Sequence, residues 1–247
     1  MTTALVFMLK ALGPCEQERV EHAKNTSNMA TVVLLENASS HSIRRLGEQN
    51  IDVVFQSQVD DRLRSFGAHR SGASKPVFIR WVATRPNLRF AWHIEGDVVY
   101  TGRWQTLVDP RRWGQHDIVA DMSDLPSSQT WSRAFGSHCR VNGEACVQNR
   151  TVLKVRWPVA RISHRLALAL YDTLIQRRSK GHHEILTRHL CRVTPCTETR
   201  FAPTDMGQYV LGGWGRYMCH DPKDCQLPRE VMPNRLYHPV KCARAWM

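Results

Sequence analysis

Four cysteines near the C-terminal end of the sequence are spaced as two close pairs, an arrangement that can bind a metal. Cys191 and Cys196 are separated by four residues, and Cys219 and Cys225 by five. A structural zinc ion needs four ligands in a tetrahedron, usually supplied by two such pairs. Because both pairs are wider than the common zinc spacing, structural zinc, disulfide bonds and buried free thiols all stay open. Structural zinc is the one cofactor that the sequence suggests.

Positive charge is concentrated in a stretch that could bind a polyanion. Residues 151–200 carry ten basic and three acidic side chains. Arginine makes up 27 of the 34 basic residues of the chain, and its planar group fits phosphate with two parallel hydrogen bonds. Such cations could follow a nucleic-acid backbone without reading its bases. Alternatively, the basic stretch is a solvated helix face or a surface that binds an acidic protein. The residues expected to contact phosphate are Lys154, Arg156, Arg161, Arg165, Arg177, Arg178, Lys180, Arg188, Arg192 and Arg216.

Three histidines in the same stretch could do acid–base chemistry. His182 and His183 precede Glu184, but the second histidine of a zinc-binding HExxH motif is absent. A histidine titrates near neutral pH and could act as the general base of RNA cleavage. His182, His183 and His189 are therefore the candidate catalytic residues if the chain is an enzyme. No P-loop, dinucleotide fingerprint, nucleophile elbow or kinase signature is present, and we expect a binding protein rather than an enzyme.

Tryptophan directly follows arginine at four places, which suits single-stranded nucleic acid. The dipeptides are Arg80-Trp81, Arg103-Trp104, Arg112-Trp113 and Arg156-Trp157. Rings stack on bases while cations hold phosphate, although on a strand each tryptophan would face the core and its arginine the solvent.

The six residues Gly212–Tyr217 resemble the glycine-rich loop of the repeat-associated RNA-binding and RNA-processing proteins of prokaryotic RNA-guided defence complexes. Their Trp, Arg and Tyr side chains could contact a base or a phosphate.

Composition excludes several classes of protein. With 247 residues, of which 42% are hydrophobic, the chain can bury a core and is not disordered. The net charge of +12 favours an anionic partner. The longest apolar run, Thr2–Leu12, is too short to cross a bilayer and lacks the features of a secretory signal. We therefore expect an intracellular protein, in the cytoplasm or an organelle interior, with no membrane partner, and we take the glycosylation sequons at Asn25, Asn37 and Asn149 as chance matches.

The elements that would position these residues follow from hydrophobic periodicity and turn residues. Three apolar runs between Val77 and Thr101, separated by turns, predict an antiparallel meander. Pro158 should end the strand that precedes the basic helix. Residues 109–130 are turn-rich, and 197–247 should be irregular. Helices are expected over 16–24, 59–66, 160–178 and 183–192, and strands over 31–35, 51–56, 77–83, 88–94, 98–101 and 152–157.

These patterns predict an α+β fold with a central antiparallel sheet, a packed basic helix and an irregular, cysteine-containing C-terminal region. Residues 1–125 would form an N-terminal α+β part with the meander, and 126–247 a basic strand–helix part with a cysteine-rich tail, unless both belong to one continuous domain. The function expected is a non-catalytic nucleic-acid-binding subunit, above all for RNA, of a ribonucleoprotein or other nucleic-acid assembly with further protein subunits. A metal-independent endoribonuclease and a structural subunit of a protein-only complex are the alternatives.

Overall fold

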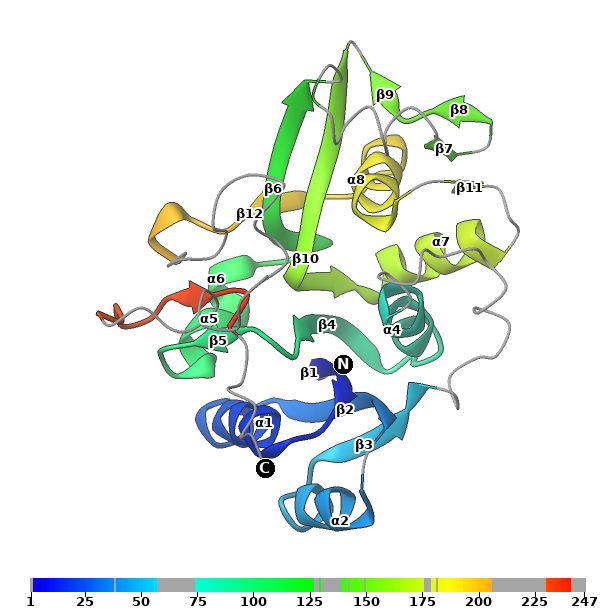
Figure 1. The fold of residues 1–247 in the computed structure, drawn as a ribbon. Coiled ribbons are helices and arrows are strands. Elements are labelled where there is room, and N and C mark those ends of the chain that lie inside the picture. The colour runs from blue at the N-terminus through cyan, green and yellow to red at the C-terminus, as the bar shows by residue number, and fades with distance from the viewer. Residues whose placement is uncertain are drawn as a thin grey trace.

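The computed structural model of the chain describes residues 2–37, 39–56, 74–126, 129, 139–141, 143–148, 150–175, 179–180, 182–205 and 230–240. A central β-sheet runs through the molecule with helices packed on both of its faces (Figure 1). The strands follow one another across the sheet in the order β12, β6, β10, β4, β1, β2, β3, with β9 paired to β10 off this path. Their bounds are β1 Thr2–Ala11, β2 Ala30–Asn37, β3 Asp52–Phe55, β4 Leu88–Glu95, β6 Ile118–Pro126, β9 Val147–Gln148, β10 Thr151–Ser163 and β12 Glu198–Arg200.

Most of the sheet is parallel. Along the path every neighbouring pair is parallel except the two pairs made by β10, which runs antiparallel to β4 and to β6. Parallel neighbours need a crossover, and helices supply it. The helix α1 (Pro14–Thr26) joins β1 to β2, and α2 (Ser40–Glu48) joins β2 to β3. All the parallel strands therefore end at the same edge of the sheet.

The central strand β1 shows why the N-terminal apolar run is a strand. Residues 4–9 are buried without interruption, which is typical of a parallel strand covered on both faces. Successive side chains point to opposite faces. Ala4, Val6 and Met8 belong to one hydrophobic cluster, and Leu5, Phe7 and Leu9 to the other.

Different helices build the two hydrophobic layers. One layer contains residues from α4 (Ser74–Ala83), α7 (His164–Ile175) and α8 (His183–Val193). The other contains residues from α1, α2 and the short helices α5 (Trp104–Val108) and α6 (Pro110–Trp113). The remaining small elements are β5 Val99–Tyr100, β7 Arg140–Val141, β8 Glu144–Ala145, β11 Ser179–Lys180, the 3₁₀ helix η3 Pro203–Asp205 and β13 Leu236–Tyr237.

The expected α+β fold with a central antiparallel sheet is wrong. Residues 77–83 are not a strand but the buried helix α4, so the meander does not exist. A short run that is apolar on every side fits a buried helix and a buried strand equally well, and periodicity cannot separate them. In addition, β5 does not pair with β4; it pairs with β13.

Two further differences concern the long strands. The turn-rich stretch 109–130 contains β6, and β10 continues through Pro158 to Ser163, so the first four residues of the expected basic helix belong to a strand. The pairing of β10 with β6 shifts register between Arg156 and Ala160, and such irregularities are where a strand accommodates proline. The helix expected over 59–66 lies outside the described residues.

The separation of the chain at residue 125 falls inside β6, whose neighbours include β10 of the C-terminal half. One sheet thus contains strands from both expected parts. Among the described residues, no helix combines the length and the apolar character that crossing a bilayer requires.

Candidate metal centre

The most chemically unusual cluster of side chains lies where β4 ends. In open α/β sheets, ligands bind outside the carboxyl ends of the strands, at the point where the chain connections reverse direction across the sheet. From β1 the order runs outward through β2 and β3 on one side, and to β4 on the other. Glu95 is the last residue of β4, and Gly96 and Asp97 form the turn that follows it.

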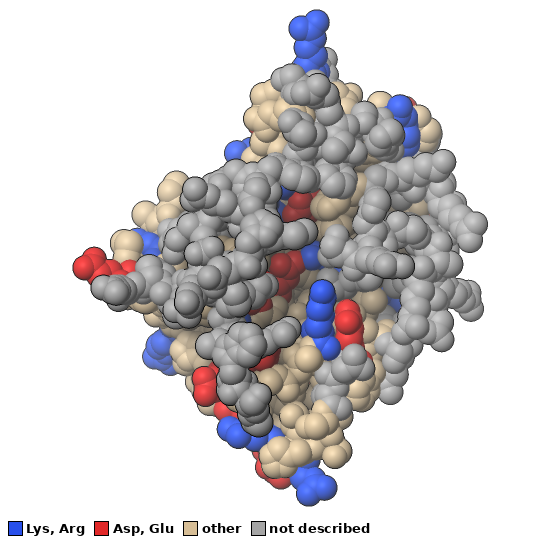
Figure 2. All heavy atoms as spheres, in the orientation of Figure 1, with Lys and Arg blue, Asp and Glu red and all other residues tan. Residues whose placement is uncertain are grey.

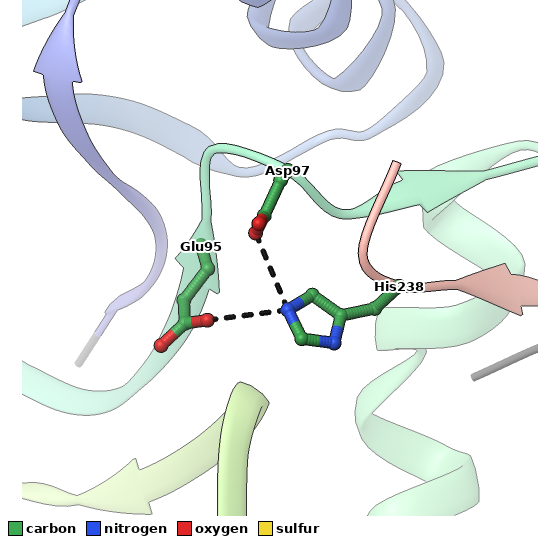
Figure 3. Close-up of side chains that lie close together, drawn as sticks. All are labelled: Glu95, Asp97 and His238. Carbon is green, nitrogen blue, oxygen red and sulfur yellow. Dashed lines mark ion pairs between the residues drawn. The ribbon is translucent and has the colours of Figure 1, made fainter. Parts of the chain in front are cut away.

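A third residue joins this turn from the far end of the sequence. The strand β13 pairs with β5, and the amide of Val240 donates to the carbonyl of Asp97 at 2.8 Å. This pairing brings His238 to the acidic turn (Figure 3). Its Nε2 lies 3.4 Å from a carboxylate oxygen of Glu95 and 3.3 Å from one of Asp97.

The three side chains fit a divalent cation. One ligand atom from each lies within 4.8 Å of the other two, and the imidazole is only 8% exposed. Two carboxylates and one imidazole are donors suited to Mg²⁺ or Mn²⁺, while sulfur-rich sets select softer metals. Burial alone would lower the pKa of His238, but Asp97 and Glu95 outweigh it and raise the pKa to about 9. Without a cation, the imidazolium supplies the positive charge that the two carboxylates require; a bound divalent cation would replace that proton and leave His238 as a neutral ligand.

Lys75 supports the same cluster from α4. Its ammonium pairs with the Glu95 carboxylate, and Lys75 is itself buried. Burial would raise the pKa of Glu95, but Lys75 and His238 outweigh it and hold the pKa well below its usual range. Glu95 therefore stays ionised and available as a ligand.

Arg19 of α1 ties together the two segments that supply the ligands. Its guanidinium donates to the carbonyl of Gly96, between the two acidic residues, and to the carbonyl of Val240 at 2.9 Å. Burial lowers the pKa of Arg19 from its ordinary value, and nearby carboxylates including Asp97 oppose this. The residue has no direct contact with a carboxylate of the cluster in the described hydrogen bonds, so it acts on the backbone that carries them.

A second charged group lies near the cluster, at the start of α8. The Glu184 carboxylate pairs with Lys154 of β10 at 3.2 Å, and their side chains are only 15% and 6% exposed. Burial raises the pKa of Glu184. The positive charges of Lys154 and Lys75 act to lower this pKa, and the negative charge of Glu95 raises it further. Because the charges of Lys75 and Glu95 reach Glu184, the two groups share one polar region.

The candidate histidines differ in their surroundings. His182 caps α8 by accepting from the amide of Glu184, and its ring stacks on His183 at 4.3 Å. Burial, and then the nearby His182 and Lys75, push the pKa of His183 well below its ordinary value. His189 is 1% exposed, and burial lowers its pKa. His189 is thus in the core, while His182 and His183 lie toward the acidic cluster.

Most of the arginines expected to hold phosphate are occupied inside the protein. Arg161 is 2% exposed; it donates to the carbonyls of Trp113, Gly114 and His116 and lies over the ring of Phe90. Arg188 has no exposed side-chain surface and pairs with Asp124 and Glu198. The other pairs are Lys154 with Glu184, Arg156 with Asp121, Arg165 with Asp117 and Arg192 with Glu198.

These cations therefore do not form the expected continuous basic surface. Within the described atoms, Figure 2 shows acidic and basic side chains next to one another and no unbroken basic field on the face in view. Charge counts along a sequence cannot reveal this, because several of the partner carboxylates, such as Asp117, Asp121 and Asp124, come from another segment of the chain. Of the remaining expected residues, Lys180 lies in β11, and Arg177, Arg178 and Arg216 fall outside the described residues.

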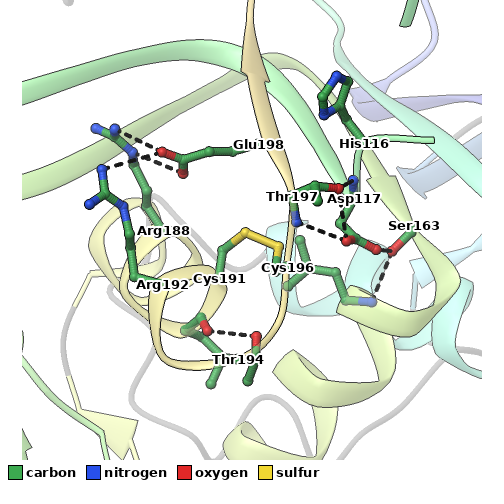
Figure 4. The surroundings of a disulfide bond; sticks show 12 residues. His116, Asp117, Ser163, Arg188, Cys191, Arg192, Thr194, Cys196, Thr197 and Glu198 are labelled. Atoms are coloured by element: carbon green, nitrogen blue, oxygen red, sulfur yellow. Dashed lines mark hydrogen bonds and ion pairs between the residues drawn. A yellow bond between two sulfur atoms is a disulfide. The ribbon is translucent and has the colours of Figure 1, made fainter. Parts of the chain in front are cut away.

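One of the two cysteine pairs that could bind zinc forms a disulfide, the alternative that the spacing also left open. Cys191 and Cys196 are bonded to each other, so their sulfur atoms are not zinc ligands. Figure 4 shows this bond between the end of α8 and the start of β12. Cys139 and Cys146 form another disulfide, and Cys15 is also disulfide-bonded. Cys219 and Cys225 lie outside the described residues.

Sequence reasoning misses the carboxylate–histidine cluster. By its residue types, Glu95-Gly96-Asp97 indicates only a turn between two strands, and His238 lies in a tail without periodicity. The available signal is the acid–x–acid pattern directly after the apolar strand 88–94. Nothing in the local sequence indicates that residue 238 meets residue 95.

No protein-family model matches the chain, and no curated protein matches it in sequence. Solved structures do match. The galactosyltransferase LgtC in complex with donor and acceptor sugar analogs has a TM-score of 0.53 at 12% identity, with 98% of this chain and 88% of that chain covered. An active-site mutant of LgtC also matches at 0.53 and 12% identity, with 97% and 88% covered. The bifunctional glycosyltransferase WbbM matches at 0.50 and 14% identity over 84% of this chain, which spans only 40% of that longer protein.

These likenesses establish the fold and correct the expected function. The mostly parallel sheet is that of the GT-A fold, which the LgtC structures share. The expected nucleic-acid-binding subunit of a ribonucleoprotein, with its ribonuclease and protein-only alternatives, is contradicted by this fold and by the internal pairing of the arginines. The chain shares its fold with LgtC and has a carboxylate–histidine cluster at the end of β4.

Proposed function

We propose that this chain is a metal-dependent glycosyltransferase that uses a nucleotide-activated sugar. The observation that carries the proposal is the convergence of Glu95, Asp97 and His238 at the carboxyl edge of the parallel strands. The fold shared with LgtC, a galactosyltransferase solved with donor and acceptor sugar analogs, supports it.

A divalent cation on these three residues would neutralise the diphosphate of the donor and stabilise it as a leaving group. Glu95 and Asp97 would supply the anionic ligands, and His238 a neutral imidazole ligand. Lys75 would keep Glu95 ionised and oriented through their buried ion pair. Lys75 and Arg19 are thus supporting residues of the cation site.

Glu184 is the candidate for the group that faces the transferred sugar. It is a largely buried carboxylate in the same polar region, and Lys154 holds it in place at 3.2 Å. Positive charge develops on the anomeric carbon during glycosyl transfer, and a nearby carboxylate stabilises it. Glu184→Gln would keep the size of the side chain and remove its charge.

We further infer that the protein resides in an oxidising compartment rather than in the cytoplasm. All five cysteines among the described residues are disulfide-bonded, and disulfides persist in oxidising compartments.

The proposed function is tested by measuring nucleoside diphosphate released from a panel of nucleotide sugars, with Mn²⁺, with Mg²⁺ and with EDTA. We expect release that requires the metal and is lost in Asp97→Asn and His238→Ala. Asp52→Asn is the matched control, since Asp52 is exposed on β3, away from the cluster. Release that persists in EDTA, or that is equal in the Asp97 and Asp52 variants, contradicts the metal centre.

A further inference from the structure

Three segments of the chain fit the acceptor sequon for N-linked glycans, Asn-x-Ser/Thr: 25–27, 37–39 and 149–151. The structure describes the side chain at only one of their asparagines, Asn25, which is exposed at the end of α1. Among the described hydrogen bonds, none involves the Asn25 amide. Its side chain is therefore free to bear a large group outside the fold.

The surroundings of Asn25 separate it from the candidate metal centre. Because α1 connects two parallel strands, it runs back from the edge where β1 ends to the edge where β2 begins. Arg19, which contacts the metal-centre backbone, precedes Asn25 by six residues, or about 9 Å along the helix. A glycan on Asn25 would leave the substrate edge of the sheet accessible.

The other two residues of the sequon are packed. The Thr26 hydroxyl donates to the carbonyl of His22 and accepts from the amide of Trp104. Ser27 is buried, and among the described residues its Oγ has no hydrogen-bond partner. A hydroxyl that is buried without a partner costs stability, so folding alone gives no reason for a serine at this position.

We propose that Asn25 is an N-glycosylation site, modified before the segment folds. In the step, the amide nitrogen of Asn25 forms a bond to the anomeric carbon of an oligosaccharide carried on a lipid diphosphate. The bond from that carbon to the diphosphate breaks, and the amide loses one proton. Ser27 is the hydroxyl that the sequon requires, and its burial afterwards fixes the order of the two events.

This proposal rests on the oxidising compartment and not on glycosyl transfer by the chain itself. The disulfides Cys139–Cys146 and Cys191–Cys196 each close a short loop, with sequence separations of 7 and 5. In eukaryotic cells the compartment in which such bonds form is also where N-linked glycans are added.

The direct test is mass spectrometry of the native protein, digested after treatment with peptide N-glycosidase in H₂¹⁸O. We expect the peptide containing position 25 to carry ¹⁸O-labelled aspartate. Recovery of the unmodified Asn25 peptide from untreated protein as its main form overturns the proposal.

Variants identify which asparagine carries the glycan. They are made in the full chain, expressed with a secretory leader in a eukaryotic host. Asn25→Gln and Ser27→Ala should each remove one glycan from the wild-type pattern. Ser27→Ala leaves Asn25 intact and deletes only an unpartnered hydroxyl, so it should fold normally. Asn28→Gln is the matched control, because Asn28 is an exposed neighbour outside any sequon, and should keep every glycan. Equal glycan numbers in wild type and both sequon variants overturn the proposal.

Two further measurements distinguish a failure of the glycosylation proposal from a failure of the proposed glycosyltransferase function. Alkylation of the native protein before and after reduction reports whether Cys191 and Cys196 are oxidised. If their thiols are reduced in the native protein, both the inferred oxidising compartment and the proposed glycosylation are wrong. Metal-dependent release of nucleoside diphosphate should be the same in Asn25→Gln as in wild type. Loss of that release in wild type would count against the proposed function alone.

Discussion

The guanidinium of Arg19 donates to the carbonyl of Gly96, the residue between Glu95 and Asp97. The same group holds the carbonyl of Val240, two residues beyond His238. Through these two carbonyls, Arg19 of α1 links the two segments that supply the candidate ligands. Arginine suits this position because its planar fork can satisfy two carbonyls at once.

Replacing Arg19 with methionine should weaken the binding of Mn²⁺ by about 10-fold, the lower range for residues that orient metal ligands. Metal affinity can be measured by calorimetry. Activity at saturating Mn²⁺ should approach the wild-type value, whereas a general folding defect would not be rescued by metal. Arg45→Met is the control, because Arg45 of α2 pairs with Glu21 of α1, the helix that also carries Arg19. Equal Mn²⁺ affinity in both variants would contradict the positioning role.

Arg188 should be a stability residue. It is fully buried and pairs with Asp124 and Glu198, so Arg188→Met leaves two carboxylates without their main partner. Both carboxylates are partly exposed and keep Arg200 or Arg192 as a partner, so the loss is that of charge-assisted hydrogen bonds, about 1.5–3 kcal/mol, which denaturant unfolding should register. Arg192→Met is the comparison, because Arg192 contacts the same Glu198 carboxylate from a half-exposed position. That variant should lose less than about 1 kcal/mol; similar losses in both would show that burial of Arg188 is not what matters.

The ion pair between Asp117 and Arg165 should make stability depend on pH. Burial would raise the pKa of Asp117, but hydrogen bonds from Arg165, Ser163 and Thr197 outweigh it and hold the pKa below its ordinary value. A lowered carboxyl pKa contributes stability that is complete above the unfolded value, about 3.9, and is lost as the pH falls through the folded value.

Arg165→Gln should therefore reduce the free energy of unfolding at pH 7 by up to about 1 kcal/mol, because Arg165 is largely exposed. The difference from wild type should shrink below pH about 4. Urea titrations at pH 7, 5 and about 3.5 would measure it. If the difference in the free energy of unfolding between wild type and Arg165→Gln grows as the pH falls, the stabilising role of the Asp117–Arg165 ion pair is contradicted.

The bond between Cys191 and Cys196 should stabilise the junction of α8 and β12. It closes a loop with a sequence separation of 5, and the chain-entropy relation gives about 2 kcal/mol for a loop of that size. The double variant Cys191→Ser/Cys196→Ser should lower the free energy of unfolding by that order. Wild-type protein under reducing conditions should show a loss at least as large. Unchanged stability in both would argue that the bond does not form in solution.

Sequence alone determined the elements whose signals are local. The helix near residues 16–24 follows a glycine and a proline, and Glu16 accepts from the amide of Gly13. The strands over 31–35 and 88–94 and the helix over 183–192 were also located correctly, because each has a clear apolar period bounded by turn residues. Local patterns of this kind depend on neighbours in the chain, and the sequence contains those.

Sequence could not determine how these elements pair. The run over 77–83 became a helix because it is buried between the sheet and other helices, a condition that no local pattern reveals. No local pattern reveals that Arg156, Arg165 and Arg188 pair with carboxylates of the segment 117–124, or that Arg192 pairs with Glu198.

The candidate metal centre belongs wholly to the tertiary structure. Its acidic residues lie at the end of β4 and in the turn after it, but its histidine comes from position 238 through the pairing of β13 with β5. Composition fixed the number of charges and cysteines, while the fold decided which charges neutralise one another and which remain to do chemistry. Electrostatic interactions act through space over a few ångströms, so contacts between residues distant in sequence exist only once the sheet has formed.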